Sequence, residues 1–499
     1  MRLVPGRESA SIWTNSFRPR PRVDVGRSPS MLGAPGLGAV YFRQRNRLHF
    51  SSPTKMLASF AHMISVNRGR IQRLGAEGSW IILGQMAAVA GSIVSVRVLT
   101  GFLSPEQYGE LALAGTLSDL IGQVLTGGLI LGLGRFYSIA AERADLHQFL
   151  RAARSCMGQA MLAVLCVAIA LSIVMGVVNA WDWIPLSLTC LFAAAVASYN
   201  SAISSIQTAA RQRREVALHS ACAPWLKLAL VTCFLNLIGI SATSAAAGSA
   251  VSILAVTSSQ LYFLRRSTRQ HSRIPQANSA SQWQREVWTF ALPLSAWGVF
   301  TWVQQSSDRW ALQTFSTTAE LGQYAALFSL GYTPVSVASG LLTTLIAPVA
   351  YQRASASTVN DKTKHVSSLL LSVTAATVCM TLVAAFAAWI SHDWLFHWMV
   401  APEYRATSYL LPWVVIAGGI FASGQVLALD QLVRLKSRSL LIPKIVTAIL
   451  AVGVNFAGAY YFGVAGVVAG LIAFSALYFA WMGLLFAKEI SPPHEAHSP

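Results

Sequence analysis

The sequence predicts an all-α polytopic membrane protein in which about twelve transmembrane helices form two parallel six-helix lobes around a central cavity. Three observations predict this fold: an apolar composition, long apolar stretches at regular intervals, and a motif that occurs twice, half the chain apart. Of the 499 residues, 54% are hydrophobic and only 11% are charged. Soluble domains carry about 25% charged residues, so the composition favours a chain that lies largely in lipid.

Twelve apolar stretches lie between residues 80 and 487, and each is close to the roughly 20 residues that a helix needs to cross a bilayer. They cover residues 80–101, 109–134, 156–179, 183–208, 217–239, 241–264, 286–307, 323–350, 366–390, 406–430, 440–461 and 464–487. The gaps at residues 240 and 462 are the shortest separations. We therefore expect twelve membrane-spanning helices.

Positive charge alternates between the expected connections. Five of them together hold eighteen Lys and Arg residues: 135–155, 209–216, 265–285, 351–365 and 432–439. The alternate connections hold only Arg405, apart from Arg97 and Arg309 at the ends of spans. By the positive-inside rule, this alternation places the five basic connections and both termini in the cytoplasm. The net charge of +18 would suggest nucleic acid for a soluble chain, but its distribution is that of a membrane protein, and we expect no nucleic-acid partner.

The first 76 residues differ from the rest of the chain. They contain thirteen basic and two acidic residues and are rich in Ser, Pro and Gly, a composition that cannot bury a core and predicts disorder. The segment resembles an organellar transit peptide, or it reflects a start codon placed too far upstream, with Met56 and Met63 as alternative starts. The expected organisation is an extension (1–76), an N-lobe (77–264), a cytoplasmic linker (265–285), a C-lobe (286–487) and a cytoplasmic tail (488–499).

A repeated motif links the two expected lobes. The stretch SVRVLTGFLSPEQYGELALAG begins at Ser95, and DRWALQTFSTTAELGQYAALFSLG begins at Asp308. Each copy places an Arg before a Phe, a Glu and a Gly close to a Tyr. Six spans separate the copies, so both have the same orientation. Parallel repeats of this kind are typical of transporters that work by alternating access, although common ancestry or a shared helix-start signal would also explain the repetition.

Three segments resemble a known family: the stretch from Val96 to Ser138, the second copy of the motif, and MVAPEYRATSYLLPWVVIAGGIF near residue 400. They look like the polysaccharide transport family, whose members flip lipid-linked O-antigen, capsule and exopolysaccharide repeat units. This family belongs to the superfamily that also contains multidrug and toxin extrusion transporters and the peptidoglycan-precursor flippase. Twelve expected spans favour the polysaccharide branch, because the peptidoglycan-precursor branch typically has fourteen.

The resemblance implies a transporter of the bacterial inner membrane. Its substrate would be a polyprenyl-pyrophosphate-linked oligosaccharide, moved from the cytoplasmic to the periplasmic leaflet by alternating access. Its partners would be this lipid-linked oligosaccharide, membrane lipids and other polysaccharide assembly proteins. The alternative in the same superfamily is a cation-coupled multidrug or organic-cation antiporter.

Ionisable side chains inside a membrane are costly and need a reason. Cationic residues in a cavity wall would hold a pyrophosphate, and amide side chains would bind sugar hydroxyl groups. The candidate substrate-binding residues are Arg97, Arg309, Lys227, Lys444, Gln304 and Gln305. The cations could instead extend to the membrane surface, and the glutamines could join helices to one another.

Two acidic residues are candidates for coupling transport to H⁺ or Na⁺. Asp119 lies ten residues into the second expected span, and Asp308 precedes Arg309 in the second copy of the motif. Asp119 could instead be protonated and hydrogen-bonded within the bundle, and Asp308 could simply pair with a neighbouring residue.

The sequence contains no signal for an enzyme or a cofactor. There is no nucleophile–base pair, no phosphate-cradling glycine loop and no large outer loop. His392, Asp393, His397 and Glu403 lie close together in the sequence, but their spacing matches no metal-ligand pattern. We therefore expect no metal, no catalytic residue and no cofactor beyond a coupling ion.

Overall fold

The computed structural model describes residues 82–268, 280–356, 359–434 and 437–490. Within these ranges all regular structure is helical, which confirms the all-α prediction. The predicted extension (1–76) lies outside the described residues, as do residues 269–279 of the predicted linker and 491–499 of the predicted tail.

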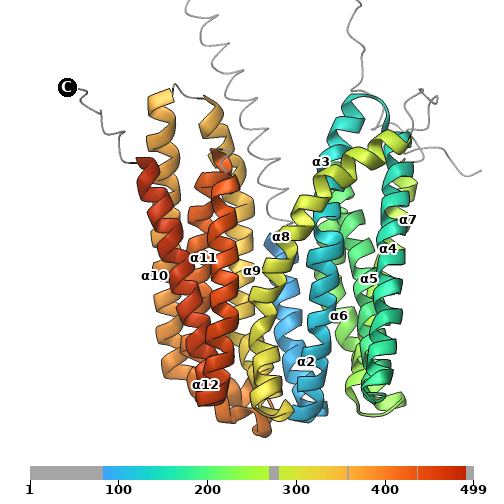
Figure 1. Cartoon of the computed structure of the whole chain (residues 1–499), viewed down its shortest axis with the longest axis vertical. Helices are drawn as coiled ribbons and strands as arrows, with labels where there is room; N and C mark the ends of the chain where they lie inside the picture. Colours follow the sequence, from blue (N-terminus) through green and yellow to red (C-terminus); the bar gives the residue numbers. More distant parts are fainter. Residues whose placement is uncertain (1–81, 269–279, 357–358, 435–436, 491–499) are drawn as a thin grey trace, which may run out of the picture. The chain divides into compact units, whose positions relative to one another are not determined.

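The N-terminal helix group, as we call residues 82–268, is a series of long helices joined by short turns (Figure 1). It comprises a first helix (Ile82–Phe102), α2 (Pro105–Leu120), a π-helical turn η1 (Ile121–Thr126), α3 (Gly127–Glu142), α4 (Leu146–Val177), α5 (Trp183–Ala209), α6 (Arg213–Leu237) and α7 (Ala242–Thr268). α2, η1 and α3 follow one another without a break, so they act as one long helix with a local widening at η1.

The C-terminal helix group covers residues 280–490. It comprises α8 (Ala280–Phe315), α9 (Thr318–Ala356), α10 (Val359–Met399), the 3₁₀ segment η3 (Pro402–Leu410), α11 (Leu411–Val433), the short η4 (Ser437–Leu440) and α12 (Leu441–Ile490). α12 is interrupted at Gly463, which has φ 55° and ψ −132°. Because only glycine adopts this region of φ easily, the two expected spans 440–461 and 464–487 are two helical segments joined at this residue.

Ten helical segments are long and apolar enough to cross a membrane. The segment Leu441–Glu489 counts once among them although it contains the break at Gly463, and α8 is not among them. The polar run around Gln304 to Arg309 makes α8 less apolar than the other helices. The structure therefore supports a multi-pass membrane protein, and the number of twelve crossings stays a prediction.

Most contacts between helices lie within one of the two groups, and the groups meet through α2, η1, α3, α4, α8 and α9. α8 is the element that joins them, because its first half packs on α3 and α4 and its second half packs on α12. The indole nitrogen of Trp283 donates to the carboxylate of Asp145 at 2.7 Å, and both side chains are buried. The start of α8 is thereby fixed to the N-terminal helix group.

Both copies of the repeated motif form helix starts. Ser104 accepts a hydrogen bond from the backbone of Gln107, whose side chain accepts one from the backbone of Ser104, a capping box that satisfies two otherwise unpaired amides. At the start of α9, the hydroxyl of Thr317 accepts a hydrogen bond from the backbone of Glu320. The helix-start interpretation of the motif is therefore confirmed.

Candidate functional site between α2, α8 and α9

The repeated glycines, Gly109 and Gly322, face each other where α2 crosses α9. A methyl group on Gly109 would overlap the carbonyl oxygen of Thr318, and one on Gly322 would overlap that of Pro105. Thr318 and Pro105 each lie four residues before the glycine of their own helix, so the contact is symmetric between the two copies. Only a residue without a side chain allows backbones to approach this closely.

Further contacts close the same end of α2 and α9, which we call the glycine end. The hydroxyl of Tyr404 donates to the carbonyl of Leu103 at 2.8 Å, and the Tyr404 ring meets the edge of Tyr108. The amide of Gln323 donates to the carbonyl of Glu403 at 2.9 Å. The opposite end of the helices, where the arginine-rich turns lie, is called the basic end below.

α8 presents two polar faces, and the adjacent residues Gln304 and Gln305 belong to different ones. Successive residues of an α-helix point about 100° apart. Gln305 is exposed and its side-chain oxygen accepts a hydrogen bond from Gln123 of η1 at 2.9 Å. Gln304 is buried and contacts Lys444 of α12. The predicted glutamine pair is thus divided between an inter-group face and the interior of the C-terminal helix group.

Gln123 has a second feature that the sequence analysis missed. Its side-chain oxygen is buried and has no hydrogen-bond partner within the described residues. A buried unpaired acceptor is costly, so this atom favours a ligand or a water that donates a hydrogen bond. A methyl group on Gly298 of α8 would overlap the Gln123 backbone carbonyl, which shows how closely α8 approaches the π-helical turn. π-helical turns within α-helices are frequent at functional sites.

Asp308 and Arg309 lie next to this inter-group face. Asp308 is buried, and its carboxylate accepts hydrogen bonds from the backbone of Arg309 at 2.7 Å and from the hydroxyl of Tyr324 at 2.6 Å. Arg309 is half-buried and donates to the carbonyl of Gln305 at 3.3 Å. The carboxylate of Asp308 is therefore fixed by its partners, whereas the guanidinium of Arg309 keeps further donors.

Aromatic rings and one carboxylate complete the surroundings of Arg309. The guanidinium lies 5.1 Å from the centroid of the Phe328 ring, which stacks on Tyr332 of the same helix, a favourable cation–π arrangement. Asp119 of α2 is exposed and close enough to interact electrostatically with both Arg309 and Asp308. The structure thus brings together four predicted site residues: Arg309, Gln305, Asp119 and Asp308.

Lys444 occupies a different environment inside the C-terminal helix group. It is 5% exposed, and its ammonium donates to the side-chain oxygen of Gln304, whose amide contacts Thr447 at 3.5 Å. On the same face of α8, Ser307 accepts a hydrogen bond from Asn455 at 2.9 Å. In the part of the chain that the structure describes, no carboxylate forms an ion pair with Lys444. This lysine therefore contributes to the packing of α8 on α12.

Arg97 and Lys227 are not part of the cluster around Arg309. Lys227 is exposed on α6, near the thiol of Cys190 on α5. Arg97 is exposed on the first helix and forms no side-chain hydrogen bond or ion pair with a described residue. Lys227 and Lys444 lie in the fifth expected span of their respective lobes, but their surroundings differ, because Lys227 is exposed and Lys444 is buried.

An apolar cleft lies between the first helix and α9, with about 660 Å³ of atom-free space, part of it open to the surroundings. Its walls include Met86, Ala90 and Ile93 on one side and Pro334 and Leu341 on the other. Arg97 follows Ile93, Ala90 and Met86 by four, seven and eleven residues, which places it on the same face of the first helix. The polar cluster and the cleft therefore share α9, and Arg97 extends the face of the first helix that lines the cleft.

No metal site accompanies these residues: among the described parts of the chain, no three His, Cys, Asp or Glu side chains are grouped as metal ligands would be. His392 contacts Asp393 and Ser408, and His397 contacts Arg405. These contacts lie beside η3, at the glycine end of the C-terminal helix group.

Comparison with known proteins gives the fold its context. No protein-family model matches the chain, and no curated protein matches its sequence. Among solved structures, the lipid II flippase MurJ in an inward closed conformation aligns with a TM-score of 0.64 at 11% identity, over 84% of this chain and 88% of that one. An inward-facing multidrug resistance MATE family transporter of the MOP superfamily aligns with a TM-score of 0.56 at 14% identity, over 81% of this chain and 95% of that one.

The chain has the fold of these transporters. The eukaryotic MATE transporter AtDTX14 gives a similar result, with a TM-score of 0.54 at 14% identity over 84% of this chain and 97% of that one. A lipid flippase and drug transporters alike share this fold, and the expected superfamily stays a prediction. The polysaccharide branch within it stays a prediction.

Proposed function

We propose that this protein is a flippase for polyprenyl-pyrophosphate-linked oligosaccharides in the bacterial inner membrane, with its basic end in the cytoplasm. The observation that supports this most strongly is that a cationic polar cluster and an apolar cleft both lie against α9. A lipid-linked oligosaccharide has the same two parts, because an anionic sugar-bearing head is joined to a hydrocarbon tail. The fold shared with a lipid flippase agrees with this substrate class.

Each part of the substrate has a matching feature. The guanidinium of Arg309 offers donors in the planar geometry that binds phosphate oxygens in pairs. The unpaired side-chain oxygen of Gln123 and the exposed Gln305 suit sugar hydroxyl groups, which lose roughly 1–3 kcal/mol each when buried without a partner. The polyprenyl tail would lie in the cleft between the first helix and α9, in contact with lipid.

Transport would proceed by separation of the glycine end and closure of the basic end. Contacts at Gly109 and Gly322 close the glycine end, so the polar cluster would receive substrate from the basic end. Asp119 is exposed beside Arg309, and protonation or Na⁺ binding at this carboxylate would change the charge that the substrate head meets. We assign H⁺ or Na⁺ coupling to Asp119, and a positioning role to Asp308, whose carboxylate already has two hydrogen-bond partners.

The test is the sidedness of lipid-linked oligosaccharide in a strain that lacks the gene, probed with a membrane-impermeant glycan-modifying enzyme. We expect cytoplasmic accumulation that the wild-type gene reverses. Arg309→Gln should lower the flipping rate roughly 10–100-fold, since a charge-assisted hydrogen bond contributes about 1.5–3 kcal/mol, and Arg309→Lys should recover part of the rate. Arg151→Gln, an exposed arginine on α4, is the matched control. Normal sidedness in the deletion strain would contradict the proposal.

A second candidate function is the efflux of organic cations, which one observation favours. Asp119 is an exposed carboxylate, and the exposed ring of Trp310 hydrogen-bonds Thr116, three residues earlier on the same α2 helix, a setting that also suits a cationic aromatic ligand. In an efflux assay with a fluorescent organic cation, this function requires transport that Asp119→Asn abolishes and Arg309→Gln preserves. We expect no efflux, because Arg309 opposes a cation at this position.

A further inference from the structure

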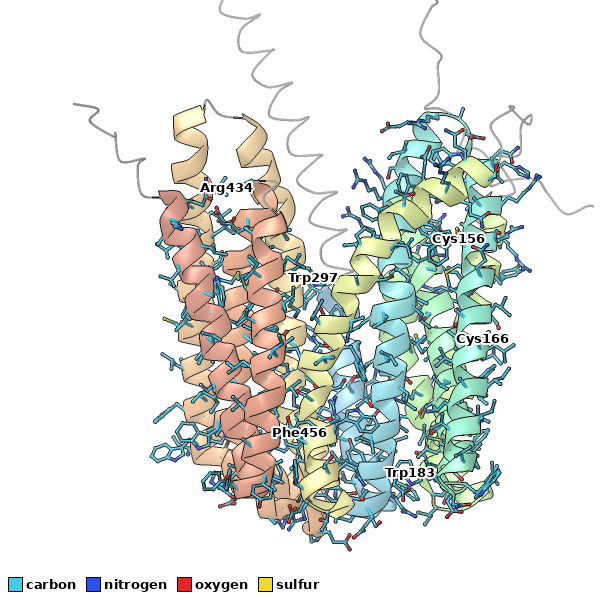
Figure 2. All side chains as sticks on the ribbon, in the orientation of Figure 1. Cys156, Cys166, Trp183, Trp297, Arg434 and Phe456 are labelled. Carbon is cyan, nitrogen blue, oxygen red and sulfur yellow. The ribbon has the colours of Figure 1, made fainter. Side chains whose placement is uncertain are left out.

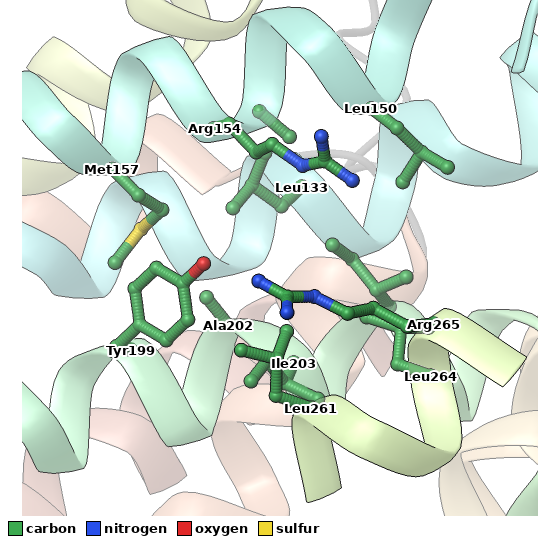
Figure 3. A pocket seen from close by; sticks show the side chains of 12 residues that line it. Leu133, Leu150, Arg154, Met157, Tyr199, Ala202, Ile203, Leu261, Leu264 and Arg265 are labelled. Carbon is green, nitrogen blue, oxygen red and sulfur yellow. The ribbon is translucent and has the colours of Figure 1, made fainter. Parts of the chain in front are cut away.

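A second cleft lies at the basic end of the N-terminal helix group, away from the site between α2, α8 and α9. It is lined by residues of α3, α4, α5 and α7 (Figure 3). α4 and α7 both pack on α5, and the cleft lies between them. Its interior is apolar and includes Leu133, Met157, Ile203 and Leu261, with about 520 Å³ of space that protein atoms do not fill, part of it open to the surroundings.

Two arginines stand at this apolar interior. Arg154 lies near the start of α4 and Arg265 in the last turn of α7, and both are exposed. Figure 3 shows the guanidinium group of Arg265 pointing toward the hydroxyl of Tyr199, and the guanidinium group of Arg154 on the facing wall, directed toward Leu150. Arg154 has no hydrogen-bond or ion-pair partner among the residues that the structure describes. Two like charges that share a space repel each other, so an anion between them would be stabilised by both.

The charged region continues beyond this cleft. An adjoining cleft shares Leu261 and Arg265 and adds Tyr262 and Arg266. All these arginines lie at the ends of membrane-spanning helices, the level at which lipid headgroups meet the protein. Basic pockets between helices on the cytoplasmic side of a membrane bind anionic lipid headgroups, and the leaflet there is itself negatively charged.

We infer that the cleft between α4 and α7 binds an anionic phospholipid of the surrounding membrane. The phosphate lies between Arg154 and Arg265 and accepts a hydrogen bond from Tyr199, and one acyl chain runs along the apolar interior beside Met157 and Leu261. A free phosphate would use the arginines and leave the apolar interior unused, whereas a zwitterionic lipid would bring its own cation toward them. The site is independent of the transported substrate.

Native mass spectrometry of the purified full-length protein in detergent tests this inference. Phosphatidylglycerol and phosphatidylcholine with identical acyl chains are added separately, and the bound lipid is counted. We expect preferential retention of phosphatidylglycerol and about a tenfold loss of affinity for each of Arg154→Gln and Arg265→Gln. Arg151→Gln removes an exposed charge from the same α4 helix outside the cleft and should leave binding unchanged.

Two further measurements separate a lipid site from a simple anion site. Ala202 is buried in the wall of the cleft, so Ala202→Leu fills the apolar interior and should reduce phosphatidylglycerol binding while both arginines remain. Inorganic phosphate at millimolar concentration should not displace the lipid. Equal binding of the two lipids by the wild-type protein, unchanged binding by the Arg154→Gln/Arg265→Gln double variant, or displacement by inorganic phosphate would each overturn the inference.

Discussion

Arg309 and Lys444 lie at different faces of α8, and their surroundings differ in exposure and charge. Arg309 belongs to α8 itself and lies half-buried beside an aromatic ring and an exposed carboxylate. Lys444 approaches from α12 and is buried against the neutral amide of Gln304. An amide oxygen offsets part of the cost of burying an ammonium group, and removal of that oxygen leaves the charge without its acceptor.

This pair gives a prediction about stability. Gln304→Leu alone should destabilise the protein by about 3 kcal/mol, because the buried ammonium loses its acceptor. The double variant Gln304→Leu/Lys444→Met should recover most of that loss, since both polar partners are replaced by apolar groups of similar size. Thermal unfolding of the detergent-purified variants measures both effects. A double variant as unstable as Gln304→Leu would show that Lys444 has another stabilising partner.

At the scale of single residues, the sequence predicts which residues form the site better than it predicts where their side chains point. It singled out Arg309, Gln305, Asp119 and Asp308, which the fold brings together, because charged and amide groups are rare in apolar helices. It could not separate Gln304 from Gln305, since the direction of each side chain depends on how α8 is rotated against α2 and α12. Gln123 was missed because one amide in an apolar stretch gives no signal until its partner is known.

At the scale of the helix, close approach at glycine decides how α2 and α9 meet. Gly109 and Gly322 are in contact with the opposite helix, whereas methyl groups on Gly115 of α2 and Gly340 of α9 would contact nothing within 4 Å. The same two helices therefore contain glycines that a close helix contact requires and glycines that face open space. The repeated motif marks the first kind, which its sequence alone could not distinguish from a helix-start signal.

Substitution of these glycines should separate the two helices. Gly109→Ala and Gly322→Ala place a methyl group against a backbone carbonyl that cannot move without its helix. In a background without the six native cysteines, a cysteine introduced by Thr318→Cys should react several-fold faster with a water-soluble maleimide in either variant. Gly115→Ala and Gly340→Ala are the controls and should leave the rate unchanged. Equal rates in all four variants would contradict a closed contact at this crossing.

The ends of the helices are predicted less well from composition than the existence of the helices. Most predicted spans coincide with described helices to within a turn or two, because apolar length is a strong signal. α8 begins at Ala280, inside the predicted linker, since Trp283 finds a buried partner in Asp145 of the other helix group. Hydrophobic periodicity does not predict a contact between two residues that lie 138 positions apart. The π-helical turn at Ile121–Thr126 was likewise not visible in the sequence.

At the scale of the whole molecule, the two ends of the helices contain different kinds of side chain (Figure 2). Arg434 is bonded to Asp430 at the basic end of the C-terminal helix group, and Arg135 and Arg143 lie over aromatic rings of α8 at the basic end of the other group. The glycine end has few cations and several exposed tryptophans, including Trp181, Trp394 and Trp398. This asymmetry is the reason to expect the basic end in the cytoplasm.

The orientation can be tested with two matched positions. Glu142 and Asp182 are exposed acidic residues just before and just after α4, at its basic end and its glycine end respectively. In whole cells of the cysteine-free variant, Asp182→Cys should react with a membrane-impermeant maleimide and Glu142→Cys should react only after the membrane is permeabilised. The reverse pattern would contradict the proposed topology and, with it, the direction assigned to transport.

The meeting of Gly109 with Gly322 also affects how the two halves of the chain can diverge in evolution. Elsewhere the two copies of the motif differ in sequence, and a change in one half leaves the other half's surroundings intact. Where a residue touches its own counterpart, a larger side chain in either half obstructs both helices at once. A substitution at either glycine therefore disturbs the same contact, and this shared constraint is a reason for both copies of the motif to contain glycine here.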